Sequence, residues 1–328
     1  MIAILGSGSC ATALVKILLE KPDRHLNWWV RRPSLAQAII STRHNPDHLP
    51  NAELDVDRLH ISSSLAQVVE QSDLLIVAHP TAYCDEMLRM VAPDVWQHHT
   101  IVSATKGFLP STDETLTETL RCHYNLKGRQ LAFIGGPAHA EEIVVGGDTF
   151  LTVAAPHRPL GVHVAQLLQA PYLHTVVTTN LPAVELAASM KNIYALAAGV
   201  CHGLGCGDNL VAVLVTRSLH EMTQYISYRY PGSEWSQYAD ASLGDLLATS
   251  YSRHSRNRTL GYRVGGGMTV REALDSMTMQ AEGYPALGAL QRQLWGCPLQ
   301  LPIAQAVYRI FYCDASPADE IGRLVASL

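Results

Sequence analysis

The stretch Ile2-Ala3-Ile4-Leu5-Gly6-Ser7-Gly8-Ser9-Cys10-Ala11 decides the fold of this chain. Apolar residues typical of a strand stop at Gly6, small residues follow at Gly-x-Gly-x-x-Ala spacing, and helical character continues to Leu19. Gly6 permits a tight turn, Gly8 lets the backbone approach a pyrophosphate, and Ala11 keeps the helix close to its strand. The N-terminal end of that helix offers N–H groups and a positive dipole to phosphates. The stretch therefore predicts a dinucleotide-binding turn.

The composition limits the class of protein. The chain has 328 residues, which is enough for about two domains. Hydrophobic residues make up 48% and charged residues 16%, which is typical of a globular protein. The net charge of -5 argues against nucleic-acid binding. No apolar stretch approaches the roughly 20 residues that a membrane span needs.

Cysteine and histidine usage predicts neither disulfides nor a metal site. The seven cysteines and 15 histidines are dispersed along the chain. Reduced, unpaired thiols are typical of the cytoplasm, and we expect this location. Cys201, His202 and Cys206 are close in sequence, but no second pair of ligands accompanies them. A packing or loop role is therefore favoured for these three residues.

A second apolar run, residues 26–30, ends in Arg31-Arg32-Pro33. At this point of the fold an acidic residue binds the adenosine ribose 2′-OH of NAD, whereas an arginine accommodates the 2′-phosphate of NADP. Arg31 and Arg32, with no acid between them and the strand, favour NADP or tolerance of both cofactors. The alternative is that both are solvated surface arginines.

Short apolar runs alternate with helical segments as far as residue 178. The runs are mostly apolar, as in parallel strands that are buried on both faces. They cover residues 74–78, 100–103, 131–134, 150–155 and 175–177. This alternation predicts an α/β fold with a Rossmann-like, doubly wound sheet as a dinucleotide-binding domain in residues 1–179. Strand signals are nearly absent afterwards, so we expect an all-α substrate domain in residues 180–328.

The first helix of the second half, residues 183–198, is apolar nearly all round and is predicted to be buried and to end at Gly199. Lys191 lies in its middle. A buried ammonium must find partners or lower its pKa, because an isolated buried charge is very costly. The alternative is a lysine that reaches the surface.

Residues 251–263 carry four arginines and no acid, in an otherwise acidic protein. Asp245 precedes this stretch and Glu282 follows it. Short basic runs are commonly solvated surface, but Ser255-Arg256-Asn257 also suits an anion, since the planar guanidinium of arginine matches phosphate oxygens.

These motifs together resemble the NAD(P)-dependent glycerol-3-phosphate dehydrogenase family. The likeness covers essentially the whole chain in family order, and several motifs are specific to the family rather than to the fold. It rests on residues 6–11, 103–107, 136–137, 191–192, 203–209, 255–258, 282–283 and 301–303. The resemblance implies reversible NAD(P)H-dependent reduction of dihydroxyacetone phosphate to sn-glycerol 3-phosphate, which supplies glycerophospholipid synthesis. It also implies a homodimer.

The resemblance assigns roles to individual positions of this chain. Lys191 corresponds to the catalytic proton acceptor, and Lys106 is the second catalytic lysine. The substrate-binding positions are Lys106, Gly136, Ala138, Lys191, Asp245, Ser255, Arg256 and Asn257. The cofactor-binding positions, including the glycine-rich turn, are Gly6, Gly8, Ser9, Cys10, Ala11, Arg31, Arg32, Lys106, Ala140, Arg256 and Glu282. No metal is expected.

Four positions depart from the family pattern. Ala138 stands where the family has Ser or Thr, so that one hydroxyl contact to the substrate is missing. His139 and Cys10 each replace an aromatic residue, and Val211 replaces Lys or Arg. The lysine pair and the Arg-Asn pair are retained. These departures leave substrate affinity and identity open.

Two alternatives are weighed against this function. One is a related Rossmann-plus-helices reductase of another 2-oxo or 3-hydroxy acid, which would be indifferent to the substrate phosphate. The other is a non-catalytic NAD(P)-binding sensor. A sensor has no need of both Lys106 and Lys191, so their joint presence favours an enzyme.

Overall fold

The computed structural model describes residues 1–233 and 240–327, which form two compact units. The sheet unit comprises Met1–Thr105 and Leu116–Pro182, and the helical unit comprises Lys106–Thr115 and Ala183–Leu328. The chain thus enters the helical unit twice. The sequence-based boundary after residue 179 assigns Lys106–Thr115 to the first domain, whereas in the structure this segment packs with the helices of the second.

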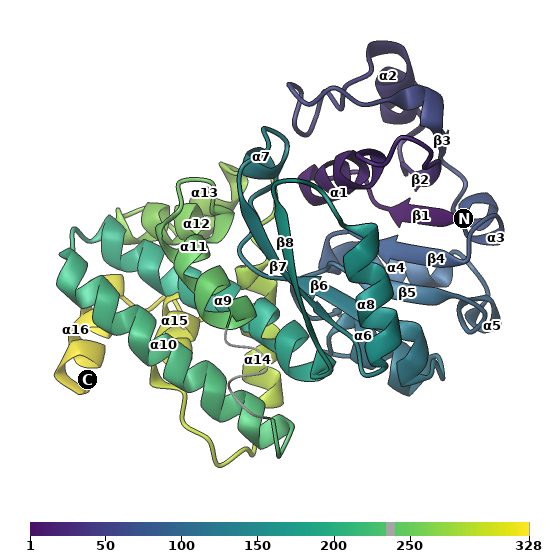
Figure 1. The fold of residues 1–328 in the computed structure, drawn as a ribbon. Helices are drawn as coiled ribbons and strands as arrows, with labels where there is room; N and C mark the ends of the chain where they lie inside the picture. Colours follow the sequence, from purple (N-terminus) through teal and green to yellow (C-terminus); the bar gives the residue numbers. More distant parts are fainter. Residues whose placement is uncertain (234–239, 328) are drawn as a thin grey trace. The chain divides into compact units, whose positions relative to one another are not determined.

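The sheet unit contains an eight-stranded sheet with the strand order β3-β2-β1-β4-β5-β6-β7-β8 (Figure 1). All neighbouring strands are parallel except β6 and β7, which are antiparallel. The strands are β1 (Ile2–Leu5), β2 (Leu26–Trp29), β3 (Leu59–Ser62), β4 (Leu74–Val77), β5 (Thr100–Ser103), β6 (Leu131–Gly135), β7 (Thr149–Ala154) and β8 (Leu173–Thr178). The expected α/β, doubly wound class is confirmed. The edge strand β3 was not expected, because its residues are only half-buried and the run contains polar His60 and Ser62.

Helices cover both faces of this sheet. One buried cluster joins α1, α2 and α8 to alternate strand residues such as Ile4 and Ile76. The residues that follow them, Leu5 and Val77, are equally buried and point to the opposite face. Figure 1 shows α1 and α8 on the near face. The helices of the unit are α1 (Ser9–Leu19), α2 (Pro33–Thr42), α3 (Leu65–Glu70), α4 (Cys84–Arg89), α5 (Pro93–Trp96), α6 (Leu116–His123), α7 (Ala140–Ile143) and α8 (Arg158–Leu167).

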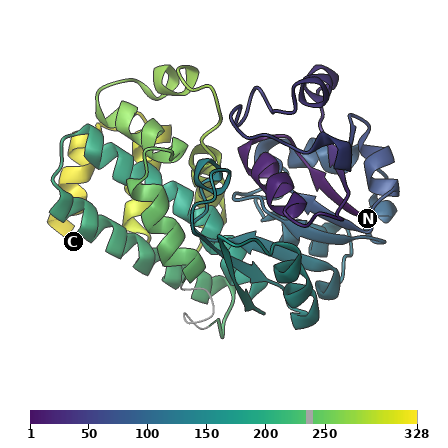
Figure 2. The same ribbon diagram turned by 45° about the horizontal axis from the view of Figure 1, so that its top comes forward.

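The helical unit is organised around one buried helix, α9 (Leu181–Gly203) (Figure 2). Its residues from Ala183 to Cys201 are buried almost without exception, as the sequence predicts. The other helices are α10 (Asp208–Arg229), α11 (Asp245–Tyr251), α12 (Arg256–Gly265), α13 (Val270–Asp275), α14 (Gly283–Gln293), α15 (Pro302–Tyr312) and α16 (Pro317–Ser327). The all-α character of the second half is confirmed for the residues that the structure describes.

The sequence predicts that helix α9 ends at Gly199, but in the structure the helix continues to Gly203. A Cβ atom at Gly199 would lie 2.2 Å from the carbonyl oxygen of Arg258, and one at Gly261 would lie 2.2 Å from that of Leu196. The two glycines therefore let α9 and α12 pack backbone against backbone. Gly199 serves close helix packing rather than helix termination.

The segment Lys106–Thr115 is attached to the helices through its own side chains and carbonyls. Arg292 of α14 donates to both carboxylate oxygens of Asp113, over 2.6 and 2.7 Å. The Ser189 hydroxyl of α9 donates to the Gly107 carbonyl over 3.2 Å. A bidentate guanidinium–carboxylate pair is among the more specific contacts that side chains make.

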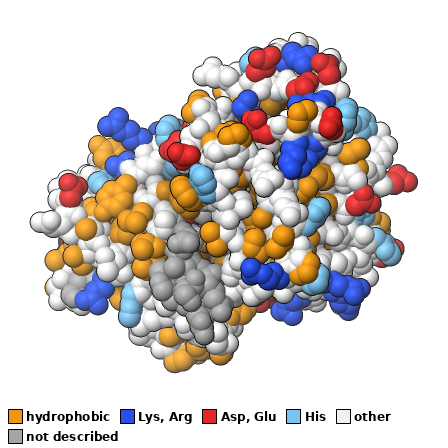
Figure 3. Space-filling view, in the orientation of Figure 1, with side chains coloured by type: hydrophobic (Ala, Val, Ile, Leu, Met, Phe, Trp, Pro, Cys, Tyr) orange, Lys and Arg blue, Asp and Glu red, His pale blue; other side chains and the backbone are white. Residues whose placement is uncertain are grey.

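Acidic and basic side chains are mixed over α2 and the loop after it rather than gathered by sign (Figure 3). Arg32 pairs with Asp47, and Arg43 pairs with Asp55 and Asp57. Across residues 1–233 and 240–327, no helix is long and apolar enough to cross a membrane.

Candidate active site

The glycine-rich turn joins β1 to α1 in the expected conformation. Gly6 has φ of +125°, and a Cβ there would lie 2.4 Å from the Ala78 carbonyl oxygen, so only glycine fits. A Cβ at Gly8 would meet no atom within 4 Å. The backbone at Gly8 therefore faces open space, as a site that admits a pyrophosphate requires. Helix α1 begins at Ser9, directly after this opening.

Two side chains hold the carbonyl groups of this turn. The Trp28 indole donates to the Gly6 carbonyl over 2.7 Å, and the Asn45 amide donates to the Ser7 carbonyl over 2.9 Å. Asn45 is fully buried and also donates to Thr12 of α1 over 2.9 Å. These two bonds, with the one from the Gly6 N–H to the Trp29 carbonyl over 3.2 Å, fix the backbone of the turn before α1 begins. The sequence predicts neither role, because Asn45 lies in a loop and Trp28 in a strand.

Arg31 and Arg32 follow β2, and each has a carboxylate partner. Arg31 Nη1 lies 3.1 Å from Glu86 Oε2, and its guanidinium lies over the Tyr83 ring, 5.1 Å from the centroid. Arg32 forms an ion pair with Asp47. The sequence places both arginines correctly at the end of the strand but reveals neither partner, since Glu86 and Asp47 are distant along the chain.

His79, after β4, lies between Trp29 and Tyr83, with ring centroids 5.3 and 5.9 Å away. Burial, with a smaller contribution from the charge of Arg31, lowers the pKa of His79 to about 4. The imidazole is therefore neutral at pH 7 and adds no positive charge beside the arginines.

The turn after β6 carries Gly136, Ala138 and Ala140. Gly136 has φ of +114°, and a Cβ there would lie 2.7 Å from the Phe150 carbonyl oxygen. Ala138 is partly buried, and Ala140 begins α7.

Two lysines meet one aspartate in the helical unit. Asp245, at the start of α11, accepts from Lys106 over 2.9 Å through one carboxylate oxygen and from Lys191 through the other. Lys191 also donates to the Thr249 hydroxyl over 2.7 Å. Thr249 in turn donates to the Asp245 carbonyl, also over 2.7 Å, one turn earlier in α11. Sequence reasoning assigned no role to Thr249, although its spacing of four residues from Asp245 places both on one helix face.

Burial and the neighbouring charges together set the protonation of this cluster. It lowers the pKa of Lys191 to about 7; the charge of Asp245 opposes the change and that of Lys106 assists it. Burial also raises the pKa of Asp245, but the two ammonium groups outweigh it and the net shift is downward. Lys191, with 5% of its surface exposed, is therefore poised to gain or lose a proton near neutral pH while Asp245 stays ionised.

A chain of amides links this cluster to two further segments. Asn192 donates to the Lys106 carbonyl over 3.0 Å and accepts from Asn257 of α12 over 2.8 Å. The side-chain oxygen of Asn257, Oδ1, accepts from the Gly283 backbone N–H over 2.8 Å. Both side-chain ends of Asn257 are thus engaged within the protein. Its side chain holds the neighbouring segments together.

The start of α12 presents a different set of groups. Ser255 is the N-cap, and its hydroxyl accepts from the Arg258 N–H over 3.2 Å. Arg256, the first helical residue, is exposed. A helix N-terminus beside an exposed guanidinium is suited to phosphate.

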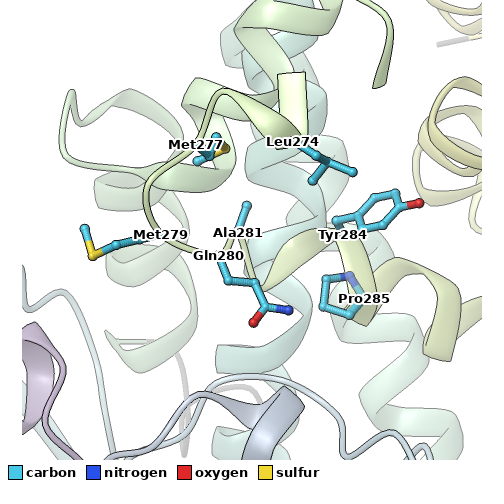
Figure 4. Close-up of a pocket in the computed structure, with 7 residues that line it drawn as sticks. All are labelled: Leu274, Met277, Met279, Gln280, Ala281, Tyr284 and Pro285. Carbon is cyan, nitrogen blue, oxygen red and sulfur yellow. The ribbon is translucent and has the colours of Figure 1, made fainter. Parts of the chain in front are cut away.

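A pocket of about 230 Å³ lies next to Glu282 in the chain (Figure 4). Its walls come from the end of α13, the loop that follows and the start of α14. The lining residues are Leu274, Met277, Met279, Gln280, Ala281, Tyr284 and Pro285.

Comparison with protein families accounts for both units. A model described as the NAD-dependent glycerol-3-phosphate dehydrogenase N-terminus matches residues 1–160, and one for the C-terminus matches residues 180–322. The chain belongs to the NAD-dependent glycerol-3-phosphate dehydrogenase family. It is 33% identical to "Glycerol-3-phosphate dehydrogenase [NAD(P)+] 2" of Salinibacter ruber, over 99% of this chain and 94% of that one. It is 31% identical to the enzyme of the same kind from Leptospira biflexa, over 99% and 97% of the two chains.

Glycerol-3-phosphate dehydrogenase structures share the whole fold. The crystal structure of the Coxiella burnetii enzyme matches with a TM-score of 0.90 and 26% identity, over 99% of this chain and 98% of that one. The family resemblance predicted from the sequence motifs is thereby confirmed. In this member of the family, Lys106 and Lys191 both contact Asp245, and Asn257 is linked to the Lys106 carbonyl through Asn192.

Proposed function

We propose that this protein catalyses the reversible reduction of dihydroxyacetone phosphate to sn-glycerol 3-phosphate with NADH or NADPH, for glycerophospholipid synthesis. The observation that carries the proposal is the Lys106–Asp245–Lys191 cluster, found in a chain of the glycerol-3-phosphate dehydrogenase family. A ketone reductase that works at neutral pH needs a proton donor whose pKa is close to 7. The pKa of Lys191, about 7, meets this requirement.

The nicotinamide cofactor, when bound, supplies a hydride to the carbonyl carbon. As negative charge develops on the carbonyl oxygen, the Lys191 ammonium stabilises it and donates a proton from Nζ. In the reverse direction the neutral amine accepts the hydroxyl proton. Asp245 and Thr249 each accept a hydrogen bond from Nζ, and so they fix its direction. Lys106 adds a second positive charge on the same carboxylate.

The substrate phosphate is assigned to the start of α12. Arg256 supplies the charge, and the first N–H groups of the helix supply donors. Ser255 and Asn257 contribute in a different way from that expected, since the Ser255 hydroxyl caps the helix and the Asn257 amide is bonded to Asn192 and Gly283. The Ser255 backbone N–H is itself bonded to the Ser252 carbonyl over 3.3 Å. We therefore assign the part of Asn257 in binding to its backbone N–H group, and a direct contact of Ser255 with the substrate stays a prediction.

The cofactor is assigned to the glycine-rich turn, with the pyrophosphate against Gly8, Ser9 and Cys10 and the adenosine ribose near Arg31. The open space at Gly8 and the bound carbonyls of Gly6 and Ser7 support this assignment. The roles carried over for Ala11, Arg32, Ala140, Arg256 and Glu282 in cofactor binding, and for Gly136 and Ala138 in substrate binding, stay predictions.

The proposal is tested by following the oxidation of NADH and of NADPH with dihydroxyacetone phosphate and, in parallel, with unphosphorylated dihydroxyacetone. We expect turnover with the phosphorylated ketone and a large loss of kcat/KM without the phosphate. Arg256→Ala should remove most of that preference. Equal rates with both ketones would instead support a reductase of another 2-oxo or 3-hydroxy acid, and cofactor binding without turnover would support a sensor.

A homodimer is proposed on the family resemblance alone, and a cytoplasmic location on the dispersed, unpaired cysteines. Light scattering during size-exclusion chromatography tests the first, with a mass of about twice the 35.8 kDa of one chain as the expected result. Fluorescence microscopy of a tagged chain tests the second.

A further inference from the structure

The ion pair between Arg31 and Glu86 spans the region where the sheet binds a nucleotide. Arg31 follows β2, and Glu86 lies in α4, which follows β4. The strand order places β1 between β2 and β4. The pair therefore bridges the two elements on either side of the strand that leads into the glycine-rich turn. Adenosine binds near this edge in doubly wound folds.

Glu86 and a 2′-phosphate would compete for the same guanidinium. The side chains of Arg31 and Glu86 are 41% and 60% exposed, so that solvent and a ligand can reach both. Tyr83 fixes the Arg31 guanidinium from one side. A 2′-phosphate carries close to two negative charges at pH 7, and on binding Arg31 it would separate Glu86 from its partner and repel it. The 2′-OH of NAD is neutral, so it can bind without separating Glu86 from Arg31 and does not repel Glu86.

We propose that Glu86 is a specificity-determining residue, which holds Arg31 in an ion pair and thereby biases the cofactor site toward NADH over NADPH. This inference rests on the proposed use of a nicotinamide dinucleotide at the glycine-rich turn. It reverses the preference that the two arginines suggest when the sequence is considered without their partners.

The size of the effect follows from the exposure of the pair. Exposed ion pairs change equilibria by a factor of about two to five. Glu86→Gln keeps the shape of the side chain and removes its charge. We expect it to lower the Kd for NADPH about two- to fivefold and to leave the Kd for NADH within experimental error.

The experiment measures the Kd of each cofactor by titration calorimetry, without substrate, for the full-length protein and its variants. Asp57→Asn is the matched control, because Asp57 forms an exposed ion pair of the same kind with Arg43, at the far end of α2. It should change neither affinity. Added salt should shrink the Glu86→Gln effect, since exposed charges are screened.

The Arg31→Ala variant and the Arg31→Ala/Glu86→Gln double variant complete a double-mutant cycle, which measures whether the two residues act together. If Glu86 acts through Arg31, then Glu86→Gln should have no effect on the NADPH-to-NADH ratio in the Arg31→Ala background. An unchanged ratio in the Glu86→Gln variant overturns the inference, as does an equal change in Asp57→Asn. Failure of both cofactors to bind the unaltered protein overturns the proposed function as well, whereas normal binding and turnover with an unchanged ratio overturns this inference alone.

Discussion

At the scale of the residue, the proposed chemistry depends on how one lysine is surrounded. Lys191 is buried, yet it keeps a carboxylate and a hydroxyl as partners, and a second ammonium lies on the same carboxylate. Burial and repulsion lower its pKa, while Asp245 limits the decrease. The result is a group that can donate a proton in one direction and accept it in the other at the same pH.

Lys191→Met should lower kcat for ketone reduction by about two to four orders of magnitude, the usual contribution of a general acid. The change keeps most of the side-chain length, and Asp245 retains its contact with Lys106. Cofactor affinity should be nearly unchanged, as measured by calorimetry. Lys21→Met, at an exposed position in the sheet unit, is the control, and comparable turnover in the two variants would contradict the role of Lys191.

The pH dependence of reduction should report the pKa of Lys191. Because the protonated amine is the donor, kcat/KM for reduction should fall as the pH rises through about 7, and oxidation should show the opposite dependence. Lys106→Met removes a charge that lowers this pKa. Its profile should therefore move to higher pH, whatever its absolute rate. A midpoint that does not move, measured in steady-state assays, would argue that another group titrates.

At the scale of the element, the positions of α9 and α12 depend on missing side chains. Gly199 and Gly261 allow the helix backbones to touch, and the Asn192–Asn257 bond lies along the same pair of helices. The sequence predicts α9 as a buried helix because its apolar pattern is continuous. It misplaces the end, since glycine both ends helices and permits close packing, and one chain cannot tell which use applies. It also reveals no helix at α12, whose arginines obscure the apolar face.

Gly199→Ala should destabilise the protein by about 1–3 kcal/mol, because its Cβ would overlap backbone that cannot move without shifting α12. Gly322→Ala is the control. Gly322 is also helical, but a Cβ there meets nothing within 4 Å, and the exchange should be neutral or slightly stabilising. Urea unfolding measures both free energies, and equal values would show that the close helix contact does not matter.

The start of α15 provides a pH-dependent contribution to stability. Glu221 of α10 is buried and accepts from the N–H groups of Ile303 and Ala304, over 2.6 and 3.2 Å, and from Tyr194. Burial raises its pKa from 4.5 to about 7, against the effect of these bonds. A raised carboxyl pKa stabilises the folded state fully below 4.5, and that contribution is lost as the pH rises through 7.

Glu221→Gln does not titrate, so it should remove this dependence. The free energy of unfolding of the unaltered protein, minus that of the variant, should fall by up to about 3 kcal/mol between pH 4.5 and 7. Denaturant titrations at several pH values measure the difference. If the free energies of unfolding of the two proteins changed in parallel with pH, the raised pKa of Glu221 would be contradicted.

At the scale of the whole molecule, the sequence predicts the fold class and the family well and the contacts less well. The glycine-rich turn and the buried strands are local patterns, and each is recognisable within about ten residues. Asn45, Glu86 and Thr249 lie far along the chain from at least one of the groups that they contact. Their partners become visible only when the chain is folded. The site residues that motifs allow us to propose are therefore those with a local signature.

Exchange of the helical unit with that of a family relative tests how the chain is divided. A chimaera that takes both segments 106–115 and 183–328 from the relative should fold and keep the two-lysine cluster. In a chimaera that takes only residues 183–328, the relative's helices must pack against residues 106–115 of the present chain. That chimaera should unfold at a lower urea concentration and have a lower kcat. Equal behaviour of the two chimaeras would show that the short segment is interchangeable.

The excursion of Lys106–Thr115 out of the sheet unit has a consequence for how such a protein can change by recombination. A gene rearrangement with one crossover between the halves would take Lys106 from one parent, and Lys191 with the aspartate that both lysines contact from the other. The helical unit is thus not encoded by one continuous stretch of the gene. A rearrangement that keeps the unit whole needs a second exchange, at the ten residues of Lys106–Thr115.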